Sequence, residues 1–209
     1  GIASGLILGN LGYTHCCIED IGVLRSIPNL TIISPADSLE VVKVLQSVLK
    51  SKENSVYIRL TGGSNNPIVY KKDYEFQIGK SIELKEGEDV TIFCTGSMVN
   101  QSLLAAEILK EQNVSCSVIN MHTIKPLDTE AITKACLKSK LIVSVEEHNI
   151  IGGLGSAVAE FKSQIQSSPK LLRIGIDDYY SKGGSYKFLL EKHGLTPASI
   201  SNNILKSLR

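Results

Sequence analysis

Hydrophobic residues are arranged along the chain in short runs that alternate with longer segments of helical periodicity. Apolar and β-branched runs predict strands at 30–34, 56–60, 90–94, 116–120, 141–145 and 171–176. Apolar residues at helical spacing predict helices at 35–49, 99–112, 129–137, 152–165, 186–192 and 197–208. Strands that are apolar on both faces and alternate with helices are typical of parallel sheets covered on both sides. The predicted fold class is therefore α/β, with parallel sheets flanked by helices.

A polar stretch divides this pattern into two units. Residues 67–80 include Lys71-Lys72-Asp73 and show no clear periodicity, so we interpret 71–80 as a linker. Residues 1–70 carry too few strands for a whole α/β domain, and we expect them to be the later part of one. Residues 81–209 are expected to form a complete α/β domain with three layers. Asp37 or Ser38, and later Asp128, are predicted to cap helices.

Composition excludes several classes of function. The 22 Lys and Arg residues nearly balance the 21 Asp and Glu residues, which gives no electrostatic reason to expect nucleic acid or an anionic membrane as a partner. No apolar run is long enough to span a bilayer, and the first residues lack the basic start of a signal peptide. The five Cys residues show no metal-ligand spacing. Reduced thiols, a cytoplasmic location and no bound metal are expected.

His15 lies in a glycine-rich loop, where a histidine side chain can reach a substrate. Gly9-Asn10-Leu11-Gly12 leads to His15, ahead of a short predicted helix. A histidine in such a loop can transfer a proton or bond a substrate oxygen, and the alternative is a histidine that only braces the loop. Glu19 and Asp20 are expected in the first turn of the helix, stabilised by its N-terminus.

Four other candidates have plainer interpretations. Gly152-Gly153-Leu154-Gly155 could cradle a phosphate, but a tight turn that needs positive φ is favoured. Glu146-Glu147-His148 could be an acid/base or metal cluster, but it lacks a second histidine at helical spacing, so a polar cluster at a strand end and an interface is favoured. Cys16-Cys17 could bridge only with strain. His122 and His193 show no supporting neighbours.

Linked motifs make the chain resemble a known family. The motifs in the first unit are Gly-x-x-Thr14-His15-x-x-Ile18-Glu19-Asp20, Arg25-Ser26-Ile27-Pro28-Asn29-Leu30 and Pro35-Ala36-Asp37. Those in the second unit are Thr95-Gly96-Ser97, Lys125-Pro126-Leu127-Asp128, Glu146-Glu147-His148-Asn149, Gly152 to Glu160 and Gly194-Leu195-Thr196. Together they resemble transketolases and their thiamine-diphosphate relatives, above all the C-terminal half or separate C-terminal subunit of a bacterial-type transketolase.

The resemblance implies a cofactor and partners. In that family thiamine diphosphate lies between domains of two protomers, one binding the diphosphate and Mg²⁺ and the other the aminopyrimidine. Residues 1–70 resemble the back half of the pyrimidine-binding domain, so the activating glutamate and the stacking aromatics are expected to be missing. The chain alone is therefore expected to bind neither cofactor nor metal. Expected partners are a second copy in a homodimer, an N-terminal diphosphate-binding domain or subunit, and sugar substrates.

Several positions that face the substrate in the family carry other residues in this chain. Of these positions, only His15 matches the family pattern, and it is the one catalytic candidate. The usual aspartate before the Thr-His pair is replaced by Leu11, an upstream histidine falls at Ala3, and an arginine for the sugar phosphate is replaced by Thr61 or Gly62. Loss of an arginine that makes charge-assisted bonds removes a strong anchor for a phosphate. We therefore expect substrates other than the ordinary pentose phosphates.

The resemblance implies transfer of a two-carbon ketol unit between a ketose and an aldose, with His15 bonding oxygens of the donor. The chain alone is expected to be inactive. Within the superfamily, the alternatives are part of a deoxyxylulose-phosphate synthase or a β-type subunit of a 2-oxoacid dehydrogenase. The non-enzyme alternative is an assembly module that folds and dimerises without turnover.

Overall fold

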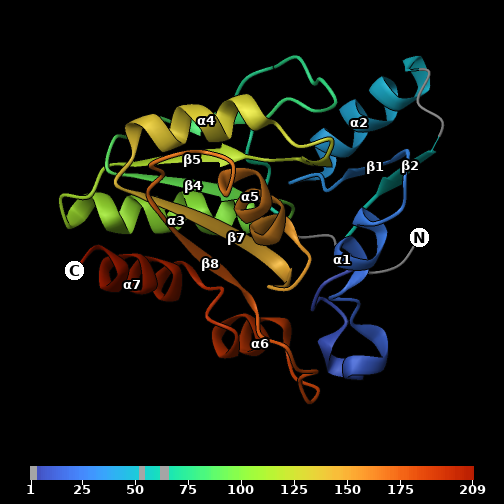
Figure 1. Ribbon diagram of the computed structural model, residues 1–209. Coiled ribbons are helices and arrows are strands. Elements are labelled where there is room, and N and C mark those ends of the chain that lie inside the picture. The colour runs from blue at the N-terminus through green and yellow to red at the C-terminus, as the bar shows by residue number, and fades with distance from the viewer. Residues whose placement is uncertain (1–3, 52–54, 62–65) are drawn as a thin grey trace.

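The computed structural model describes residues 4–51, 55–61 and 66–209, which form two sheets flanked by helices (Figure 1). The strands are β1 (Leu30–Ile33), β2 (Ser55–Ile58), β3 (Ile82–Lys85), β4 (Val90–Cys94), β5 (Cys116–Asn120), β6 (Thr123–Lys125), β7 (Leu141–Asn149) and β8 (Lys170–Ile176). The helices are α1 (Asp20–Arg25), α2 (Ser38–Lys50), α3 (Met98–Glu111), α4 (Thr129–Lys138), α5 (Leu154–Lys162), α6 (Tyr186–Lys192) and α7 (Pro197–Leu208), preceded by the 3-10 turns η1 (Gly9–Leu11) and η2 (Tyr13–His15). The predicted α/β fold class is confirmed.

The larger sheet is the centre of the second unit. Its strand order is β3-β5-β4-β7-β8, with β3 antiparallel and the other pairs parallel. Helices α4 and α5 cover one face, and α3 and α7 cover the other (Figure 1). Side chains of a strand point alternately to its two faces, so Ile92 packs on the α3 side while Phe93 packs on the α4 and α5 side. Burial on both faces explains why these strands are continuous apolar runs.

The smaller sheet combines strands from both units. Its order is β2-β1-β6, with β1 parallel to β2 and antiparallel to β6. Strand β6 follows β5 directly in the chain, yet it pairs with the first unit, where Ile124 joins Ile21 and Ile32 in a small core. The second unit therefore supplies one edge of the first unit's sheet. The division of the chain into 1–70, 71–80 and 81–209 stays a prediction.

The connecting segment is anchored by one buried carboxylate. Residues 66–81 form no helix or strand, as expected for a linker. Glu40 in α2 accepts hydrogen bonds from the Tyr70 hydroxyl at 2.6 Å, the Tyr74 hydroxyl at 3.1 Å and Asn120 Nδ2 at 3.0 and 3.1 Å. Burial raises the pKa of Glu40 despite these donors. Glu40 thus joins the first unit, the linker and strand β5.

Most element boundaries lie within three residues of the predicted ones. Strands β4 and β5 and helices α6 and α7 have the predicted bounds. Asp37 caps α2 by accepting from Glu40 N at 2.9 Å, and Asp128 caps α4 by accepting from Ala131 N at 3.2 Å. Strands β3 and β6 were not predicted, and β7 continues past the predicted Val145 to Asn149. Among the described residues, no helix has the length and apolarity that crossing a membrane requires.

Candidate functional site

His15 lies at the end of η2 in a tight double turn on the surface. Gly12 joins the two 3-10 turns at a φ of 79°, a left-handed conformation that glycine adopts without strain. Backbone bonds from Gly12 N to Gly9 O (2.9 Å) and from His15 N to Gly12 O (3.1 Å) fix the path. The His15 side chain is exposed, and its Nδ1 is 2.9 Å from Thr14 Oγ1. No described residue is hydrogen-bonded to Nε2, which is therefore available to a substrate oxygen.

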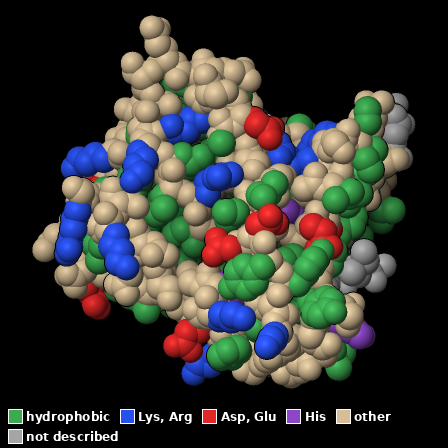
Figure 2. Space-filling view, turned by 60° about the horizontal axis from the view of Figure 1, so that its bottom comes forward, with side chains coloured by type: hydrophobic (Ala, Val, Ile, Leu, Met, Phe, Trp, Pro, Cys, Tyr) green, Lys and Arg blue, Asp and Glu red, His purple; other side chains and the backbone are tan. Residues whose placement is uncertain are grey.

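The surface around this turn is apolar but not hollow. Leu8, Leu11 and Tyr13 are exposed next to it. Figure 2 brings this end of the molecule forward and shows hydrophobic side chains gathered there among a few charged ones. The cavity beneath the turn measures only about 10 Å³. Larger hollows of about 360 Å³ against α4 and about 660 Å³ along α3 are lined by no residue of the turn.

Asp20 corrects one expectation, because its main partner is a buried arginine and not the helix N-terminus. Its Oδ2 accepts from Arg59 Nε at 2.9 Å and from the Tyr57 hydroxyl at 2.8 Å. The side chains of Asp20 and Arg59 are only 4% and 2% exposed. Burial alone would raise the pKa of Asp20, but the charge and hydrogen bond of Arg59 outweigh it and hold that pKa below its usual value. Both groups are therefore charged at neutral pH.

Arg59 also joins the two units. Its Nη2 donates to the backbone oxygen of Glu147 in β7 at 3.0 Å and to that of Cys17 at 3.4 Å. Sequence reasoning passed over Arg59, which follows directly after β2. The sequence signal for this pair was a single arginine at the end of an apolar run. An arginine is almost never fully buried unless it is paired, so a buried position there predicts an acidic partner.

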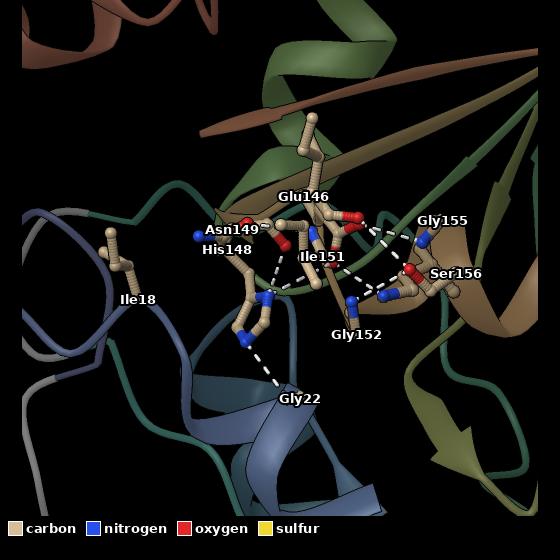
Figure 3. A network of polar contacts seen from close by, with 12 residues as sticks. Ile18, Gly22, Glu146, His148, Asn149, Ile151, Gly152, Gly155 and Ser156 are labelled. Atoms are coloured by element: carbon tan, nitrogen blue, oxygen red, sulfur yellow. Dashed lines mark hydrogen bonds and ion pairs between the residues drawn. The ribbon is translucent and has the colours of Figure 1, made fainter. Parts of the chain in front are cut away.

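The cluster Glu146-Glu147-His148 lies at the C-terminal end of β7 and at the interface between the units, as favoured, and its side chains are buried. Figure 3 shows Glu146 and His148 with their polar contacts. His148 Nε2 accepts from Gly22 N of α1 at 3.2 Å, and its Nδ1 donates to Asn149 O at 2.6 Å. These bonds require a neutral ring, because Nε2 must be unprotonated to accept. Burial lowers the pKa of His148 to about 4, which agrees with that state.

Glu146 explains the glycine-rich turn that follows β7. Its carboxylate accepts from Leu154 N at 2.6 Å and from Gly155 N at 2.8 Å, at the N-terminus of α5. A phosphate at this position would need the same two donors, so the turn interpretation is preferred to a phosphate cradle. Gly152 has a φ of 79°, and a Cβ there would lie 2.8 Å from Gly22 Cα. The expected positive φ is confirmed.

Glu147 ties three separate segments together. Its Oε1 accepts from Leu6 N at 2.5 Å, and its Oε2 accepts from the Tyr186 hydroxyl at 2.7 Å and from Ser97 Oγ. The carboxylate is fully engaged and 1% exposed. Glu147 therefore fixes the start of the described chain against α3 and α6, and it is not free to act on a ligand.

Replacing Glu146 with glutamine is expected to change how stability depends on pH. Burial raises the pKa of Glu146 to about 7, so between the unfolded value of 4.5 and pH 7 the folded state holds a proton that the unfolded state has lost. Raising the pH through this window therefore destabilises the wild type, by about 3 kcal/mol in total. The stability of Glu146→Gln relative to wild type should rise by that amount from pH 4.5 to 7 and then level off.

Urea unfolding of both proteins at pH 5, 6, 7 and 8 measures this difference. Comparing the two proteins cancels the opposite contribution of His148, whose lowered pKa makes stability rise with pH between about 4 and 6.5. A difference that is constant across pH would mean that Glu146 titrates normally.

The other predicted positions are placed as follows. Thr61 is buried and accepts from Asn66 Nδ2 at 3.2 Å, and Leu11 is exposed beside His15. Ala3 and Gly62 lie outside the described residues. Cys16 and Cys17 are unbridged.

The two remaining histidines each contact a hydroxyl group and an aromatic ring. His122 Nδ1 is 2.9 Å from Thr123 Oγ1, and its ring packs on Phe76. His193 Nε2 is 2.6 Å from Ser181 Oγ, and its ring lies against Tyr179. Both histidines have lowered pKa values because of burial. Neither belongs to the turn that carries His15.

That the chain alone binds neither thiamine diphosphate nor Mg²⁺ stays a prediction, which the described residues can be compared with. Among them, no group of three or more His, Cys, Asp or Glu side chains is placed to hold a metal ion. The buried carboxylates Glu146 and Glu147 are saturated by donors of this chain. A cofactor site next to His15 would need walls from residues other than these.

Two family profiles match the chain. The profile "Transketolase, pyrimidine binding domain" matches residues 2–66, and "Transketolase, C-terminal domain" matches residues 79–200. The putative transketolase C-terminal section of Methanocaldococcus jannaschii is 39% identical over 208 residues, covering 99% of this chain and 64% of that protein. The 6-deoxy-6-sulfo-D-fructose transketolase subunit SqwH of a Clostridium species is 40% identical over 189 residues, covering 90% of this chain and 58% of that protein.

A solved structure is similar to this chain as well. A split-gene transketolase described as an inactive beta4 tetramer superposes with a TM-score of 0.84 at 35% identity, covering 94% of this chain and 62% of that one. The chain thus spans about three fifths of the length of these relatives.

Proposed function

Because this chain belongs to the transketolase family, we propose that it forms one wall of a thiamine-diphosphate-dependent active site that transfers a two-carbon ketol unit between a ketose and an aldose. The other wall comes from a diphosphate-binding domain or subunit. The observation that carries the proposal is the exposed His15 turn, whose Nε2 is hydrogen-bonded to no described residue and whose cavity measures only about 10 Å³. A histidine in this position can bond an oxygen of the donor sugar once a partner encloses it.

Two features support self-association together with a partner. Helix α2 exposes Leu39, Val42, Leu45 and Leu49 at helical spacing, an apolar stripe of the kind that protein contacts cover. The printed description of the split-gene relative names an inactive tetramer of its beta chain. We infer that this chain associates with copies of itself, as in a homodimer, and gains activity only with the diphosphate-binding half.

The substrate we propose is a ketose other than the ordinary pentose phosphates. Leu11 is exposed beside His15 and offers no hydrogen bond to a sugar hydroxyl. Thr61 is buried and neutral where a phosphate-binding arginine is expected. The name of one relative, SqwH, specifies 6-deoxy-6-sulfo-D-fructose, and a modified ketose in a relative of this chain supports the proposal. Unbridged Cys16 and Cys17 support a cytoplasmic location.

Calorimetric titration with thiamine diphosphate and Mg²⁺ tests the shared site. The chain alone should give no saturable heat, because the buried carboxylates of Glu146 and Glu147 are occupied and the described residues include no group placed to hold a metal ion. A mixture with the polypeptide that supplies the diphosphate-binding half should bind saturably and transfer a ketol unit. That polypeptide titrated alone is the matched control.

The titration distinguishes a shared active site from an assembly module without turnover. Tight saturable binding by the chain alone would contradict the shared site. A mixture that assembles and binds the cofactor, but transfers no ketol unit between any tested ketose and aldose, would favour the assembly module instead.

A further inference from the structure

The turn that carries His15 rests on a segment of the second unit. Residues 179–184, called the bracing segment below, lie between β8 and α6. Gly184 N donates to Gly9 O at 2.9 Å, which joins the bracing segment to η1. The approach is close, because a Cβ on Gly9 would lie 2.1 Å from Leu189 Cδ1 and 2.9 Å from Gly184 O. Figure 1 shows the two turns and α6 at the same end of the molecule.

Tyr180 contacts the chain on both sides of His15. Its ring lies 5.9 Å from the ring of Tyr13, centroid to centroid, at an interplanar angle of 39°. Its hydroxyl donates to Glu19 Oε1 at 3.0 Å, while Glu19 Oε2 accepts from Ile18 N at 2.7 Å. One side chain of the second unit therefore spans the segment in which His15 lies.

The bracing segment is itself held in place. Ser181 Oγ is 2.6 Å from His193 Nε2, at the end of α6. The ring of Tyr179 packs on His193 with centroids 5.4 Å apart. The conformation of the segment is thus tied to a helix of the second unit, and Tyr180 transmits that constraint to the His15 turn.

We propose that Tyr180 is a positioning residue for His15, so that the second unit governs the geometry of the reactive turn in addition to assembly. The inference rests on the proposed function for its effect on turnover, but not for its effect on the turn. Small displacements of a positioned group are costly, since a misplacement of about 1 Å can lower a rate about 100-fold. Tyr180 does not touch the substrate in this scheme and acts through Tyr13 and Glu19.

The first test is NMR of the chain itself, with histidine labelled and the His15 signals assigned by their loss in His15→Gln. In Tyr180→Ala, which loses both contacts, the His15 ring signals should shift and broaden. Tyr180→Phe keeps the ring contact and should give a smaller shift. Tyr179→Ala keeps both Tyr180 contacts and removes only the packing on His193, so it should move the His193 signals and shift the His15 signals less than Tyr180→Ala does. Unchanged His15 signals in Tyr180→Ala would overturn the proposal.

The second test is steady-state kinetics of the assembled enzyme. Tyr180→Ala should lower kcat about 10-fold with little change in cofactor affinity, and Tyr180→Phe should recover most of the rate. An unchanged kcat in Tyr180→Ala, with His15 signals that do shift, would show that the turn's position does not affect turnover and would overturn the catalytic part. If the wild-type assembly transfers no ketol unit, the proposed function fails, and the NMR result still decides whether Tyr180 positions His15.

Discussion

Arg59→Met is expected to lower the free energy of unfolding by about 3–5 kcal/mol, because it leaves Asp20 as a buried charge without its partner. The two side chains are almost completely enclosed, and among the described residues Tyr57 and Ser4 would remain to donate hydrogen bonds to the Asp20 carboxylate. The variant also loses the bonds from Arg59 to the backbone of Cys17 and Glu147, so the contact between the two units weakens. Urea unfolding at pH 7 measures the effect.

A double variant separates the lost charge pair from lost packing. Asp20→Asn combined with Arg59→Met removes both charges, and it should be more stable than Arg59→Met alone. Lys140→Met is the matched surface control. It removes the Lys140–Asp89 pair, in which the lysine is 75% exposed, and it should leave stability almost unchanged. A loss in Arg59→Met no larger than in this control would contradict the assignment of a buried charge pair.

His15→Ala is expected to lower the turnover of the assembled enzyme about 100-fold while leaving cofactor affinity nearly unchanged. Turnover should fall because the bond from the imidazole to the substrate oxygen is lost. Cofactor affinity should hold because the imidazole is exposed and Thr14 is its one hydrogen-bond partner among the described residues, so its removal opens no cavity in the fold. Initial rates with a ketose donor, together with calorimetric titration of thiamine diphosphate, measure the two quantities on one preparation.

Two further variants sharpen this experiment. His15→Asn keeps a polar group at the turn and should retain more activity than alanine. Thr14→Val removes the bond to Nδ1 and should cause a smaller loss than His15→Ala. If His15→Ala kept full turnover, His15 would be a bracing residue of the loop, which is the alternative left open by the sequence.

The sequence predicted the second unit better than the first, for physical reasons. Strands β4 and β5 are buried on both faces, so their apolar runs predict them to the residue. Strand β6 is only Thr123–Lys125, and its partner β1 is remote in the chain, so no local pattern marks it. Strand β7 was shortened in the prediction because Glu146 and Glu147 are charged types, although both are buried.

Some residues of the candidate site could also be predicted from the sequence, and others could not. The loop and its histidine were recognisable from glycine spacing, and the structure places His15 on an exposed turn. The partner of Asp20 was not recognisable, because Arg59 is distant in sequence and a carboxylate in a first helical turn is usually explained by the helix dipole. The contacts of Tyr180 are also tertiary, and nothing in the neighbouring residues indicates them.

The pairing of β6 with β1 restricts movement of the two units relative to each other. A hinge between the two units would have to separate β6 from β1, break the Arg59 bond to Glu147 and pull Leu6 N from the Glu147 carboxylate. Since these are buried hydrogen bonds, breaking them together would cost several kcal/mol, on the order of 1 kcal/mol or more for each. The chain is therefore expected to behave as one stiff body. In the shared site that we propose, access to His15 would then depend on movement of the partner, with this chain as the fixed frame.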